Sequence, residues 1–135
     1  MGISIYAVIE YDDSQNEEAF AASPRGVIPL TDYWDLRDSK DLTFLKLTKR
    51  WGAGSRNELP KGLPISVSQQ AREDMLSYEN EYTSWSDFEE ILEAMESFDL
   101  SLSDLEFQSQ VVLGMMERLA LWLGPSRVRI IVSSQ

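Results

Sequence analysis

Hydrophobic and polar residues alternate near the start of the chain, and a second apolar run lies near its end. Ile3, Ile5, Ala7 and Ile9 occupy every other position, which is typical of a β-strand with one buried face. Residues 127–132, Arg-Val-Arg-Ile-Ile-Val, predict a closing strand. Because an isolated strand leaves its backbone hydrogen-bonding groups without partners, we expect the first and last strands to pair.

The segment after the first strand mixes turn formers with short apolar runs. Residues 12–26 are polar and predict a loop. Residues 27–30 predict a short edge strand, because Pro29 has no N–H to donate to a neighbouring strand. Residues 31–47 predict a helical stretch, and residues 50–64, with three glycines and two prolines, predict a loop.

Three serines have the capping-box pattern that begins many helices. In a capping box, the serine side chain and a glutamate or glutamine three residues later each accept a backbone N–H of the first turn. The pattern occurs as Ser66/Gln69, Ser86/Glu89 and Ser103/Glu106. We expect residues 77–85 to break the chain between the first two helices and Gly124-Pro125 to end the third.

The order of the predicted elements is strand, short strand, three to five helices and strand, which indicates an α+β fold. We expect a small sheet that pairs the N- and C-terminal strands, with the helices covering one face. The long helix before Gly124 is apolar around more than half of its circumference, so we expect it to be central. A chain of 135 residues fits a single globular domain, residues 1–135.

The composition removes several kinds of chemistry. The chain has no cysteine, which excludes a disulfide, a thiolate zinc site and a thiol nucleophile. It also has no histidine, the usual general base near neutral pH and the commonest transition-metal ligand. Neither G-x-S-x-G nor S-x-x-K occurs. We therefore expect a protein that is not an enzyme and that carries no cofactor.

The charge favours a basic partner. The formal net charge is −11, which argues against direct binding of nucleic acid and against docking to an anionic membrane. No apolar run approaches the length of a membrane span, and no secretory signal is evident at the start. The sequence thus predicts a soluble cytoplasmic protein whose partner is a basic protein. Its oligomeric state is left open.

The negative charge is concentrated in one part of the chain. From Glu73 to Glu117 there are thirteen acidic residues and no lysine or arginine, whereas residues 25–72 hold nine basic and five acidic residues. A purely structural helix would more naturally mix the two signs, because like charges four residues apart are mildly destabilising. We therefore expect a partner-binding surface made of acidic residues with aromatic anchors. Its candidate members are Glu79, Glu81, Tyr82, Trp85, Glu89, Glu90, Glu93 and Glu96.

Other interpretations of these residues stay open. The acidic tract also fits a solvated helix surface, or carboxylates that hold Mg²⁺ or Ca²⁺ for an enzyme or a small-ligand binder, although no EF-hand spacing occurs. Lys61 beside the predicted helix start at Ser66 could hold an anion, but simple capping is the favoured interpretation. The Gly-rich segment 52–57 lacks the G-K-[ST] ending of a phosphate-binding loop and is expected to be a linker.

Short motifs spread along the chain resemble a group of uncharacterised small proteins of phages and prophages. The motifs are Ser-Ile-Tyr-Ala-Val-Ile-Glu-Tyr at the start, Lys-Gly-Leu-Pro-Ile-Ser-Val-Ser-Gln-Gln from Lys61, Tyr-Thr-Ser-Trp-Ser-Asp-Phe-Glu-Glu-Ile from Tyr82 and Arg-Val-Arg-Ile-Ile-Val at the end. The chain departs from the group's pattern in having Lys61 in place of arginine and no histidine before Ser84-Trp85. The resemblance implies a phage accessory setting and transfers no activity.

These observations together predict a non-enzymatic phage accessory protein. It would bind and block a host or defence protein through the acidic surface of residues 73–106, in the host cell cytoplasm if the gene is phage-encoded. A toxin-neutralising immunity protein would share the compact, acidic character. The third alternative is the Mg²⁺-dependent enzyme or ligand binder, which needs at least three carboxylates that converge in a pocket.

Overall fold

The computed structural model of the chain describes residues 5–30, 62–76 and 82–134. The elements in these ranges are the strands β1 (Ile5–Tyr11), β2 (Gly26–Pro29), β3 (Tyr82–Asp87) and β4 (Val128–Ser134), the α-helices α3 (Gln69–Leu76), α4 (Phe88–Ser97) and α5 (Phe107–Leu123), and the 3-10 turns η1 (Leu102–Asp104) and η2 (Pro125–Arg127). The predicted helix at residues 31–47 and the predicted loop up to residue 61 lie outside the described residues.

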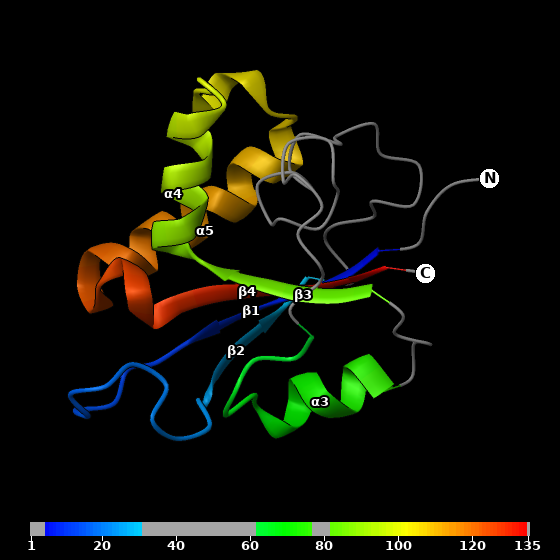
Figure 1. Cartoon of the computed structure of the whole chain (residues 1–135), viewed down its shortest axis with the longest axis vertical. Helices are drawn as coiled ribbons and strands as arrows, with labels where there is room; N and C mark the ends of the chain where they lie inside the picture. Colours follow the sequence, from blue (N-terminus) through cyan, green and yellow to red (C-terminus); the bar gives the residue numbers. More distant parts are fainter. Residues whose placement is uncertain (1–4, 31–61, 77–81, 135) are drawn as a thin grey trace.

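The four described strands form one antiparallel sheet in the order β2-β1-β4-β3. The first and last strands are neighbours, with Ile9 opposite Ile130, so the predicted pairing and the α+β class are confirmed (Figure 1). β2 lies at one edge of the sheet, where the missing N–H of Pro29 is tolerated.

The sheet carries helices on both faces rather than one. Ala7, Ile9 and Ile130 point into the main core beneath α4 and α5. On the opposite face, Val8 and Ile131 pack in a second core that includes Ala71 of α3 (Figure 1). The prediction of one covered face was wrong because the central strands β1 and β4 are apolar on both sides, which is typical of strands buried between two layers.

The long C-terminal helix α5 packs on the sheet through one side only. Its apolar side chains Val112, Leu113 and Met116 are buried in the main core. Three large apolar residues elsewhere on the helix remain exposed: Phe107 (75%), Leu121 (72%) and Trp122 (78%). Part of the apolar surface of α5 is therefore left unburied by the described elements.

Each described helix begins close to a predicted capping box, but the capping residues differ. At α3 the Ser68 hydroxyl, not that of Ser66, accepts the N–H of Ala71 at 3.1 Å. At α4 the box is Asp87 with Glu90. The third predicted box is replaced by a bond from the N–H of Ser101 to Asp104, which closes η1, and α5 starts three residues after Asp104. Residues with capping side chains occur at several neighbouring positions before each helix, so the pattern alone does not select the one that caps.

The strand β3 occupies residues for which a chain break was predicted. Its sequence, Tyr-Thr-Ser-Trp-Ser-Asp, lacks the aliphatic alternation of the other strands. Ser84 and Ser86 lie opposite Val132 and Ile130 of β4 and are fully buried. The small polar residues of β3 give no strand pattern in the sequence. The strand forms because it pairs with β4, more than forty residues later.

No helix within the described ranges is long and apolar enough to cross a membrane.

Candidate functional site

The capping box that starts α4 fixes the direction of its side chains. Asp87 Oδ1 accepts the N–H of Glu90 at 2.8 Å, and Glu90 Oε1 accepts the N–H of Asp87 at 3.2 Å. Phe88 and Ile91 then anchor the helix in the main core. Since Glu90 is half-buried and serves the cap, it belongs to the helix start and not to the exposed side of α4.

The exposed side of α4 carries three glutamates, Glu89, Glu93 and Glu96, which we call the acidic face. The spacing of four and then three residues places these side chains next to one another along the helix. Leu92, which is 46% exposed, flanks this row, three residues after Glu89 and four before Glu96. The helix contains no basic residue, and Glu96 stands in the last turn, where the helix dipole disfavours a negative charge.

The predicted partner-binding residues are divided by the structure. Glu79 and Glu81 lie outside the described residues, and Tyr82 is the first residue of β3. Trp85 is half-buried and packs with the second core, on the opposite side of the sheet from α4. The structure thus brings together Glu89, Glu93 and Glu96 on one surface and places Trp85 in a different environment.

That environment is organised by a buried ion pair between neighbouring strands, which the sequence analysis did not identify. Arg129 on β4 lies directly opposite Glu10 on β1. Arg129 Nη2 is 2.7 Å from Glu10 Oε1, and Arg129 Nε donates to the same oxygen at 2.8 Å. The available signal was a single acid in the first strand and an arginine within Val-Arg-Ile-Ile, but only the register shows that the two residues meet.

The ion pair also ties residues 65–68 to the sheet. Glu10 Oε2 accepts the N–H of Ser68 at 2.8 Å. Arg129 donates to the carbonyl oxygens of Ile65 (3.2 Å) and Ser66 (3.3 Å). Burial lowers the pKa of Arg129, and the negative charge of Glu10 offsets part of this effect. The segment before α3 is therefore anchored by a carboxylate and an arginine within the protein.

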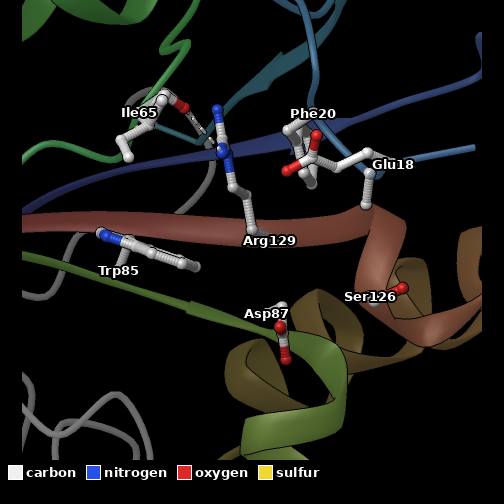
Figure 2. Close-up of a pocket in the computed structure, with 8 residues that line it drawn as sticks. Glu18, Phe20, Ile65, Trp85, Asp87, Ser126 and Arg129 are labelled. Atoms are coloured by element: carbon white, nitrogen blue, oxygen red, sulfur yellow. Dashed lines mark hydrogen bonds between the residues drawn. The ribbon is translucent and has the colours of Figure 1, made fainter. Parts of the chain in front are cut away.

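A cavity of about 320 Å³ lies beside Arg129 (Figure 2). Its walls include the aromatic residues Phe20 and Trp85, the aliphatic side chain of Ile65, and the carboxylates of Glu18 and Asp87. The guanidinium carbon of Arg129 is 3.7 Å from the centroid of the Phe20 ring and 5.9 Å from that of Trp85. Arg129 thus stacks on the Phe20 ring and lies near the Trp85 ring, and these three groups form one wall of the cavity.

A second ion pair holds the loop that supplies Glu18 and Phe20. Asp12 accepts the N–H groups of Ser14 (2.9 Å) and Phe20 (2.7 Å) and a hydrogen bond from Arg127 Nη1 (2.9 Å). Burial by itself raises the pKa of Asp12, but these hydrogen bonds and the charge of Arg127 outweigh it and lower the pKa. Arg127 also donates to the carbonyl oxygens of Asn16 and Glu17, so the whole turn is fixed against η2.

The other predicted chemistries find no site in the described ranges. No group of three acidic residues there converges in an arrangement that could hold a metal ion. Lys61, the residue suggested as an anion ligand, lies outside these ranges. The start of α3 is capped by the hydroxyl of Ser68, so capping occurs there as predicted, although by a different serine.

No protein-family model matches the chain, and no curated protein or solved structure matches it significantly. The function is therefore argued from the geometry of the acidic face and the Arg129 cavity.

Proposed function

We propose that the chain is a non-enzymatic accessory protein that binds a basic surface of another protein through the acidic face of α4. The observation that carries this proposal is the exposed row of Glu89, Glu93 and Glu96 on a helix with no basic residue. The row belongs to a longer acidic tract, because no lysine or arginine occurs between Glu73 and Glu117.

The physical argument concerns repulsion within the helix. Two like charges three or four residues apart destabilise an isolated helix by about 0.2–0.5 kcal/mol per pair. Two such pairs lie on the acidic face: Glu89 with Glu93, and Glu93 with Glu96. A basic partner would turn this repulsion into attraction and would be steered toward the surface by the net negative charge. Leu92 adds an apolar contact at the edge of the face.

The proposed role is to block a host or defence protein whose basic surface serves nucleic acid. An acidic surface competes for such a site because it presents negative charge in the place of phosphates. The resemblance to small phage proteins gives this setting, in which the chain would act in the host cytoplasm. The carboxylates then act by charge and position and need no catalytic group.

The proposal is tested by capture from a bacterial lysate with the immobilised full chain. The test variant replaces the acidic face with Glu89→Gln, Glu93→Gln and Glu96→Gln. A matched control removes three exposed charges away from α4, with Asp13→Asn, Glu17→Gln and Glu73→Gln. Both variants change the net charge from −11 by the same amount.

We expect the wild-type chain to retain a basic protein at low salt and to release it at high salt, as screening requires. The control variant should retain the same protein, and the α4 variant should lose it. Equal retention by both variants would contradict the proposal, because binding would then depend on net charge or on another surface.

A further inference from the structure

The cavity beside Arg129 has the composition of a site for a positively charged side chain. Arg129 itself lines the cavity but is only 2% exposed, and its charge is matched by Glu10 at 2.7 Å. Three of its hydrogen bonds go to Glu10 and to the carbonyl oxygens of Ile65 and Ser66. The positive charge of the cavity wall is therefore already paired within the protein.

The other charged groups of the lining are acidic. Glu18 and Asp87 both line the cavity; Asp87 Oδ1 accepts the N–H of Glu90 at the start of α4, and Glu18 is exposed. Figure 2 shows the side chain of Glu18 directed from its loop toward the side of the cavity where Phe20 and Arg129 lie. With the Glu10–Arg129 pair neutral overall, the cavity favours a cation over an anion.

The remaining walls suit an aliphatic stem. Trp85 is half-buried, and Ile65 is 87% exposed at the entrance. Lysine and arginine side chains lay their methylene groups on such apolar surfaces while their charged ends stay near carboxylates or aromatic rings. A cavity of about 320 Å³ is at the small end of ligand pockets, which fits one side chain better than a cofactor.

We propose that this cavity binds a lysine or arginine side chain of the partner, with the stem against Trp85 and Ile65 and the charged end at Glu18. The inference deepens the proposed function, on which it rests for the basic nature of the partner. It adds a second contact on the opposite side of the sheet from the acidic face, so the partner would reach around the edge formed by β3.

A small probe tests the cavity without the partner. Butylguanidinium, which has an aliphatic stem and a cationic end, is titrated into the ¹⁵N-labelled full chain while the indole N–H signal of Trp85 is followed by NMR. The Trp85→Phe variant assigns that signal among the four tryptophans. Butanol and butyrate serve as neutral and anionic probes with a similar stem.

The expected result is a saturable shift of the Trp85 signal with butylguanidinium in the millimolar range and much smaller shifts with the other probes. Glu18→Gln should weaken binding roughly threefold, as the loss of one partly screened charge would. The neighbouring exposed variant Glu17→Gln should leave the binding unchanged. Amide signals that stay in place show that each variant remains folded.

Two results would overturn the inference: a shift with butyrate as large as that with butylguanidinium, or an affinity unaltered by Glu18→Gln. The first would mean that Arg129 attracts an anion despite its pairing with Glu10. The α4 variant should titrate like the wild type in this experiment. Failure of the cavity and failure of the acidic face are thus seen separately.

Discussion

Arg129 and Glu10 face each other at matched positions of β4 and β1, and their charged atoms meet at 2.7 Å with side-chain exposures of only 3% and 0%. The pair holds Ser68 at the start of α3 and brings Arg129 under the ring of Phe20. One ion pair therefore connects the sheet, the helix α3 and the loop that lines the cavity.

The buried pair gives the first prediction. Glu10→Ala should lower the free energy of unfolding by about 3–5 kcal/mol, because it leaves the charge of Arg129 buried without a partner. The double variant Glu10→Leu with Arg129→Met should lose clearly less, since no buried charge remains. Urea unfolding of the three proteins measures this difference. A double variant that loses as much stability as Glu10→Ala, or more, would contradict this account.

Asp12 makes the stability of the fold depend on pH. Its pKa in the folded chain lies below the ordinary value of 3.8, so the ionised form stabilises the fold. This contribution is fully present above the unfolded pKa and is lost as the pH falls through the lower folded pKa. Asp12→Asn should therefore be less stable than the wild type near neutral pH, and the gap should narrow in acid.

Urea midpoints at neutral pH and below pH 3.8 provide the measurement. The exposed neighbouring variant Asp13→Asn is the matched control and should remain close to the wild type near neutral pH. A gap for Asp12→Asn that widens in acid would have the wrong sign for a depressed pKa.

At the start of α4, mutation can distinguish the observed cap, Asp87, from the predicted cap, Ser86. Asp87→Ala should cost about 0.5–2 kcal/mol of stability, which is usual for the loss of an N-cap side chain. Ser86→Ala should cost nothing or stabilise, because the Ser86 hydroxyl is buried without a hydrogen-bond partner in the described part of the chain. Thermal or urea unfolding of both variants measures these stabilities and shows which residue caps the helix. The reverse order of stabilities would restore Ser86 as the cap.

The outer side of α5 should be insensitive to substitution. Trp122 is 78% exposed, so Trp122→Gln should change the stability by no more than about 0.5 kcal/mol. Ile130, fully buried in the main core, provides the contrast, since Ile130→Ala should cost about 2–5 kcal/mol. A large loss for Trp122→Gln would indicate that this side of the helix is covered in solution.

The sequence predicted the parts of the fold that depend on local periodicity. The alternation around Ile9 and the apolar run ending at Val132 marked the two central strands, and the break at Gly124 marked the end of α5. The strand β3 was missed because its buried serines depend on β4 and not on a pattern of their own. The caps were displaced by one or two residues because adjacent polar residues compete for the same N–H groups.

The candidate site, too, was predicted from the sequence only in part. The spacing of Glu89, Glu93 and Glu96 predicts a shared helix surface, and the structure places all three on it. Glu90 could not be separated from them, because its role follows from the helix starting at Phe88. The cavity depends on contacts between Phe20, Trp85 and Arg129, which come from three distant parts of the chain. No local pattern indicates such a meeting.

Amide hydrogen exchange of the full chain, alone and bound to the basic protein that it captures, tests the proposed contact most directly. A partner that binds the folded α4 suppresses its local opening and slows exchange there. The proposal predicts the strongest protection in residues 88–98, with weaker protection at residues 17–20 and 85–87 around the cavity. Protection confined to α5 or to α3, with exchange in α4 unchanged, would contradict it.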